Sequence, residues 1–337
     1  MPKLLKNILQ SAFFLGIGAL LIWWALRPLT PEQRTDIKNS IFQANYWPVI
    51  PAFIIGVFSH LVRAVRWKLL MHPLGYNPKT SNTFYAVMIG YLANLAVPRL
   101  GEIARCGILA RYEKIPADKL IGTMIAERAV DLLCLILVMF ITVMVQIDVV
   151  GTFFSEKIWT PMSDKIASAN GSQLVVMIGI AAVVVFLIYF LLKRFARSKA
   201  AIKLKALIRG VMEGILSIGK MQKKGWFIFH TVLIWVLYFG MLYAGFYCMK
   251  ETSELGPKAC LALLSFGSIA MIITPGGIGA YPIFIQQTLL LYNIHETSGY
   301  AFGWIVWGAQ TILVFALGIY SVIGLAVAKK HTAATPA

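Results

Sequence analysis

The residues most able to do chemistry in this sequence are charged side chains within otherwise apolar stretches. Arg99, Glu102 and Arg105 follow one another at intervals of three, so they share one face if a helix resumes after Gly101. Guanidinium groups form paired hydrogen bonds with carboxylates and phosphates. This segment therefore predicts either an ion-pair network or a site for an anionic group.

A second charged segment contains Glu127, Arg128 and Asp131, with the two carboxylates one helical turn apart. Ionisable side chains within membrane spans are costly, and they normally face the protein interior, where they pair or line a substrate path. Two interpretations stay open. In one, three arginines neutralise three carboxylates and specify packing without binding anything. In the other, the same side chains hold a substrate head group.

Further polar candidates lie before these segments. Arg63, Arg66, Trp67 and Lys68 could form an ordinary anchor at the membrane–water interface. They could instead recognise anionic head groups, with arginine making bidentate phosphate contacts. Asn94 is polar within an apolar run, where it could cap a broken helix or hydrogen-bond a ligand.

The remaining candidate is a run of glycine and proline, formed by Pro275, Gly276, Gly277 and Gly279. Proline removes a backbone donor and glycine permits positive φ, so this run leaves amide and carbonyl groups unpaired. At membrane depth such backbone is tolerated only inside protein or along a wet cavity. The glycine amides could form an anion nest or a helix N-terminus for phosphate.

The elements that position these residues belong in a membrane, because 59% of the 337 residues are hydrophobic and only 13% are charged. The formal net charge of +17 is typical of basic cytoplasmic loops, and no soluble basic domain is evident that would bind nucleic acid. Apolar segments of about 20 residues have the length to span a bilayer. They begin near Ile8, Trp47, Ile121, Leu174, Trp226 and Tyr300.

Two more apolar stretches, Phe84 to Arg111 and Pro257 to Asn293, are interrupted near their middles. We interpret them as re-entrant helical hairpins, the first entering from the cytoplasm and the second from outside. Breaks at corresponding places in two halves are typical of inverted-repeat transporters. The expected fold is a single domain over residues 1–337, an all-α polytopic membrane protein with six full transmembrane helices, two re-entrant hairpins and a possible inverted repeat.

The loop charges predict the orientation. Between Lys193 and Lys224, ten basic residues face one acidic residue, which indicates the cytoplasm. Apolar residues recur there at helical spacing, so 193–225 reads as an amphipathic helix on the inner leaflet, with a solvated linker as the alternative. The loop from Asp148 to Gly171 is then outside. Both termini are cytoplasmic, in a bacterial-type inner membrane.

Four motifs together resemble one known family. They are R-x-x-R-W at Arg63–Trp67, N-x-x-x-P-R-x-G-E-x-x-R at Asn94–Arg105, E-R-x-x-D-L at Glu127–Leu132 and P-G-G-x-G at Pro275–Gly279. Their order and spacing resemble the lysylphosphatidylglycerol synthase transmembrane-region family, also called flippase-like domain proteins. The resemblance runs from about Tyr46 to Ala328.

The resemblance implies a membrane domain that transfers lipids between leaflets. In larger relatives a soluble aminoacyl-transferase domain follows, but little sequence follows the last span here, so we expect no lysyl-phosphatidylglycerol synthesis. Relatives commonly place a glutamate shortly after P-G-G-x-G. Here Ala280, Tyr281 and Pro282 follow instead, so the substrate could differ.

The leading hypothesis is a flippase for an anionic phospholipid or lipid-linked head group, held by Arg99, Arg105 and Arg128, with carboxylates balancing the charge between loading events. A membrane-embedded enzyme with Glu127 or Asp131 as general base is an alternative. Against this alternative, the sequence shows no evident nucleophile, no metal-ligand motif and no histidine among the charged residues. A non-transporting scaffold is the third hypothesis. We expect no enzyme activity and no cofactor or metal, and we expect membrane lipids as partners, with a homo-oligomer as an open option.

Overall fold

A computed structural model describes residues 18–97, 100–147 and 221–333, together with positions 16, 160 and 163. Within these ranges the chain is helical and contains no strand. Four helices in them are long and apolar enough to cross a membrane, at Val49–Leu74, Ala117–Val145, Lys224–Cys248 and Glu296–Val327. They correspond to four of the expected spans.

The other two expected spans are only partly open to comparison. The span near Ile8 is described from residue 18, and residues 18–26 are helical. The span near Leu174 lies outside the described residues, as does nearly all of the basic segment 193–225. The total of six spans therefore stays a prediction.

Two long helices, α3 (Val49–Met71) and α11 (Lys224–Gly245), pack side by side in opposite directions. Arg66, near the end of α3, hydrogen-bonds Thr231 near the start of α11. Gly56, earlier in α3, lies against Met241 late in α11. A small residue at such a crossing allows two helix backbones to approach closely.

The first interrupted stretch forms two helices that pack together, α4 (Thr80–Ala96) and α5 (Leu100–Glu113). Val97 after α4 is extended, with φ −137° and ψ 120°, the conformation favoured before a proline. The Asn94 side chain accepts a hydrogen bond from the Gly101 amide at 2.8 Å. Of the two roles open to Asn94, capping the resumed helix is the one observed.

The second interrupted stretch forms α12 (Pro257–Ile273), a 3-10 turn η4 (Pro275–Gly277) and α13 (Ala280–Leu290). Three glycines here have positive φ, at 61° for Gly276, 75° for Gly277 and 73° for Gly279, a region that glycine enters without steric cost. The Trp307 indole donates a hydrogen bond to the Gly276 carbonyl at 2.6 Å. Both breaks therefore occur where the sequence predicts them.

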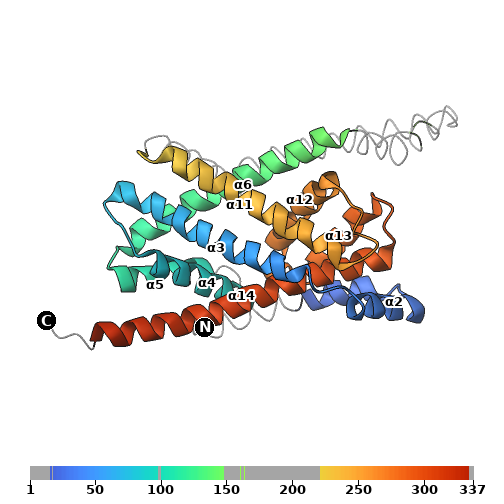
Figure 1. Ribbon diagram of the computed structural model, residues 1–337, viewed down its shortest axis with the longest axis horizontal. Helices are drawn as coiled ribbons and strands as arrows, with labels where there is room; N and C mark the ends of the chain where they lie inside the picture. The colour runs from blue at the N-terminus through green and yellow to red at the C-terminus, as the bar shows by residue number, and fades with distance from the viewer. Residues whose placement is uncertain are drawn as a thin grey trace, which may run out of the picture.

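The order of elements repeats. α3, the α4–α5 pair and α6 (Ala117–Val145) are followed, after 147, by α11, the α12–α13 pair and α14 (Glu296–Ala333). Figure 1 shows the two short-helix pairs at opposite ends of an elongated bundle, with α14 running along it. The breaks meet inside, because an ideal Cβ on Gly276 would lie 3.0 Å from the Leu95 side chain of α4.

Two apolar cores accompany the two pairs. One surrounds Trp67 and contains residues of α4, α5 and α6, and the other surrounds Phe302 and contains residues of α12 and α13.

The short turns η1 (His72–Leu74) and η3 (Phe246–Cys248) end α3 and α11. Helix α2 (Pro31–Phe42) packs on α14 and begins at a capping box between Thr30 and Gln33.

Candidate functional site

Helices α3, α5 and α6 bring five charged side chains into one buried group, named here the arginine cluster. Arg63 lies 2.7 Å from Asp131 and 3.0 Å from Glu127. Arg66 lies 2.6 Å from Asp131 and 3.3 Å from Glu127. Arg105 of α5 reaches the second oxygen of Glu127 at 2.8 Å. Each carboxylate is thus shared by at least two guanidinium groups.

The cluster is enclosed by protein. Arg66 and Glu127 are 0% exposed, Arg105 is 2% exposed and Arg63 is 5% exposed. Charges in such a place are tolerated only when they are paired and hydrogen-bonded. The Trp67 ring forms part of the wall, with the Arg105 guanidinium 4.5 Å from the ring centroid, a cation–π arrangement.

The arginine cluster and its neighbour Arg128 do not balance electrically. Arg128 lies 4.0 Å from Asp131, with its side chain 37% exposed. Four guanidinium groups against two carboxylates leave an excess of two positive charges. The Nε atoms of all four arginines, and Nη1 of Arg105, are buried without a hydrogen-bond partner. Free donors and excess positive charge are the two properties that an anion would satisfy.

The positions of Arg63 and Arg66 contradict the interpretation that they form an anchor at the membrane–water interface. An interface anchor would expose these side chains to lipid head groups, whereas both are buried and paired with α6. The ordinary-anchor interpretation is therefore wrong for these two residues. Trp67 is likewise fully buried, and its indole donates to Thr123 at 3.1 Å.

The predicted balance of three arginines against three carboxylates is only partly open to comparison. Glu102 is partly exposed and makes no ion pair within the described ranges, while Glu127 pairs with Arg63 and Arg66 as well as with Arg105, and Asp131 pairs most closely with Arg63 and Arg66. Arg99 and its neighbour Pro98 lie outside the described residues.

The glycine-rich break is a separate feature in this conformation. The nearest neighbours of an ideal Cβ on Gly276, Gly277 and Gly279 include Leu95, Met271 and the Gly18 backbone, and no arginine. Convergence of this backbone with the arginine cluster on one head group stays a prediction.

Two residues of α11 form hydrogen bonds with the arginine cluster but were not among the site residues predicted from the sequence. The Tyr238 hydroxyl accepts a hydrogen bond from Arg63 at 2.9 Å, and the Thr231 hydroxyl accepts one from Arg66 at 3.4 Å. They are seven residues apart, which places them on one face of the helix. This spacing of polar residues within an apolar span was the available signal.

The arrangement suits anion binding better than catalysis. Both oxygens of Glu127 are occupied by arginine donors, which leaves the carboxylate poorly placed to accept a proton from a substrate. In the described part of the chain, no group of three or more His, Cys, Asp or Glu side chains could hold a metal ion.

Fold and site together define an integral membrane protein with two helix–break–helix pairs and an arginine–carboxylate cluster in its interior. The sequence profile of the lysylphosphatidylglycerol synthase TM region matches residues 8–318. The chain therefore belongs to this family, as its motifs indicate.

A relative in the archaeon Methanocaldococcus jannaschii is described as UPF0104 membrane protein MJ1595. It is 29% identical over 129 residues, which cover 37% of this chain and 36% of the relative. The match thus spans about a third of either protein. No solved structure matches the chain.

Proposed function

We propose that this protein is a lipid flippase, which moves a phospholipid or lipid-linked compound with an anionic head group between the leaflets of the membrane. The observation that carries the proposal is the excess of two positive charges in a buried site with free guanidinium donors. A phosphate offers the oxygen acceptors and negative charge that this site lacks. Membrane lipids are then its main partners, with self-association possible.

Partner exchange would let the head group enter without leaving charges unpaired. The guanidinium groups stay protonated under all physiological conditions. Phosphate oxygens first engage the free donors of Arg105 and Arg128, and then compete with Glu127 and Asp131 for the others. Removing one partner of a buried pair is costly, and a replacement acceptor offsets that cost.

The repeated order of elements supports a transporter mechanism. α3 and α11 hold corresponding places in the two halves and run in opposite directions, as an inverted repeat requires. We propose six full spans and two re-entrant pairs, with both termini in the cytoplasm of a bacterial-type cell. Rocking of the α4–α5 and α12–α13 pairs would expose the arginine cluster to one leaflet at a time.

We further propose that the protein binds and moves lipid without transforming it. The arginine donors occupy the oxygens of Glu127 and Asp131, which supports a binding role over that of a general base. Mass spectrometry of lipids before and after incubation would reveal any product.

Transport is tested in vesicles that contain purified protein and a phosphatidylglycerol labelled with a fluorophore on one acyl chain. Dithionite bleaches the outer-leaflet fluorophores, so the loss of protected signal reports flipping. We expect a rate well above that of protein-free vesicles, whereas the flipping of a diacylglycerol with the same label, which has no charged head group to desolvate, should not depend on the protein. Equal rates with and without protein would refute the proposal.

Arg128→Gln is the matched variant for this assay. Its ion pair is the longest in the group and its side chain is partly exposed, so the variant should fold. We expect flipping to fall about tenfold, the equivalent of one lost charged hydrogen bond. Lys119→Gln removes an exposed charge elsewhere on α6 and should leave the rate unchanged.

A further inference from the structure

A polar cavity of about 640 Å³ lies at the end of the bundle opposite the arginine cluster. It is formed by α2 and the residues after it, the loop that follows α11, and the first turn of α14. Asn45 and Tyr247 on its rim stand just before α3 and just after α11. From Val49 to Arg63, α3 rises about 20 Å at 1.5 Å per residue, so the cavity and the cluster are separate places.

The lining is rich in hydrogen-bonding groups, and some of them have no partner within the protein. Eight of the lining residues carry hydroxyl or amide side chains. Within the described ranges, the side chains of Asp36, Asn39, Glu251 and Ser298 make no hydrogen bond and no ion pair. Polar side chains that are free of protein partners, around a cavity of this size, suit a hydrophilic molecule, since small-molecule sites usually measure about 300–1,000 Å³.

The charges of the cavity distinguish its ligand from that of the arginine cluster. Two carboxylates, Asp36 and Glu251, face one ammonium group, Lys250, and no arginine lines the cavity. One negative charge in excess disfavours a bare phosphate. The cavity is thus suited to hydrogen-bond donors.

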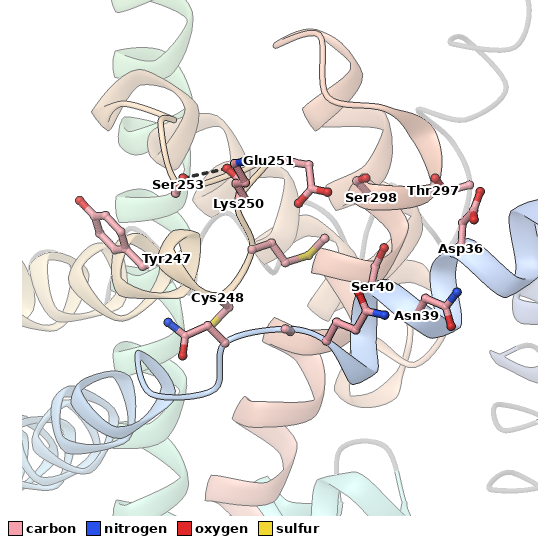
Figure 2. A pocket seen from close by; sticks show the side chains of 14 residues that line it. Asp36, Asn39, Ser40, Tyr247, Cys248, Lys250, Glu251, Ser253, Thr297 and Ser298 are labelled. Atoms are coloured by element: carbon pink, nitrogen blue, oxygen red, sulfur yellow. Dashed lines mark hydrogen bonds between the residues drawn. The ribbon is translucent and has the colours of Figure 1, made fainter.

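The positions of the carboxylates favour several hydroxyl groups over a single cation. Figure 2 shows Asp36 and Glu251 at two sides of the cavity, with Thr297 and Ser298 between them and Ser40 below. A lone ammonium group would be held best by carboxylates that converge on one point. Separate carboxylates with hydroxyls between them match a ring of hydroxyl groups, each of which both donates and accepts.

We propose that this cavity binds a polyhydroxylated head group, that is, a sugar attached to a membrane lipid. The carboxylates of Asp36 and Glu251 accept hydrogen bonds from sugar hydroxyls, and Asn39 and Ser298 supply further bonds. In the orientation that the loop charges predict, this end of the bundle faces away from the cytoplasm. The inference rests on the proposed function in one respect: the sugar is taken to be attached to a lipid that the protein carries.

The test measures binding without transport. The full chain is purified in detergent and incubated with equimolar glucosyl-diacylglycerol, diacylglycerol, phosphatidylethanolamine and phosphatidate of matched acyl chains. Native mass spectrometry then quantifies the lipid that each protein retains. We expect glucosyl-diacylglycerol to be retained over diacylglycerol, and the double variant Asp36→Asn, Glu251→Gln to lower its retention about tenfold or more, with phosphatidate retention unchanged.

Glu254→Gln is the control, because this exposed carboxylate lies in the same loop but outside the lining of the cavity. All three positions are exposed, so none of the changes should impair folding. Equal retention of glucosyl-diacylglycerol and diacylglycerol by the unchanged protein would overturn the inference. A preference for phosphatidylethanolamine that the double variant abolishes would do the same. Failure of the flipping assay with intact sugar-dependent retention would count against the flippase proposal alone.

Discussion

Replacing Asp131 by asparagine removes the charge of one of the two shared carboxylates in the arginine cluster. Asp131 receives Arg63 at 2.7 Å and Arg66 at 2.6 Å, and its side chain is 17% exposed. The substitution preserves size but removes a charge, so the excess of positive charge rises from two to three. Removing one partner of a buried ion pair costs about 3–5 kcal/mol. Partial exposure places our expectation near the lower end, at about 3 kcal/mol.

A second substitution separates the loss of charge balance from the loss of side-chain contacts. In the double variant Asp131→Asn, Arg66→Gln, the excess returns to two positive charges and the two new amides can hydrogen-bond each other. We expect the double variant to be less destabilised than the sum of the single variants, with a coupling energy of about 2 kcal/mol.

The assay is equilibrium unfolding in mixed micelles of dodecyl maltoside and sodium dodecyl sulfate, followed by tryptophan fluorescence. Exposed ion pairs contribute less than about 1 kcal/mol to stability. If Asp131→Asn lowers the free energy of unfolding by no more than this, and the two single substitutions add in the double variant, the buried network is refuted. Added phosphatidylglycerol should stabilise Asp131→Asn more than the unchanged protein, because an anion replaces the missing carboxylate. Equal stabilisation would argue against anion binding at the cluster.

Three further predictions concern the helix breaks and use the same unfolding assay. Asn94→Ala should lower the free energy of unfolding by about 0.5–2 kcal/mol through loss of the cap on α5, whereas Asn94→Asp, which keeps an acceptor oxygen, should be close to neutral. Gly101→Ala should be strongly destabilising, since its Cβ would clash with the α4 backbone, while Gly107→Ala, which meets nothing within 4 Å, should be neutral or slightly stabilising. Trp307→Phe should cost about 1 kcal/mol or more by freeing the Gly276 carbonyl.

The local features of the fold could be predicted from the sequence, whereas the partners in the site could not. The breaks depend on neighbouring residues, because proline excludes the helical conformation just before it and glycine alone enters positive φ freely. The four ion pairs between α3 and α6 join residues more than 60 positions apart, such as Arg63 and Asp131. Only the packing of α3 on α6 decides such a pairing, and for this reason Arg63 looked equally suited to an interface. Tyr238 was missed for the same reason.

The excess of two positive charges in the arginine cluster has an electrical consequence for the proposed transport cycle. A protein loaded with a phosphodiester head group, such as that of phosphatidylglycerol, keeps one positive charge in excess at this site, whereas the empty protein carries both charges. Moving one elementary charge through the full membrane potential involves about 2.3 kcal/mol per 100 mV. To the extent that the cluster moves through the membrane field, the empty return step would depend on voltage more strongly than the loaded step. A negative potential inside the cell would then favour the conformation in which the empty cluster lies closer to the cytoplasm, ready for a lipid from the inner leaflet.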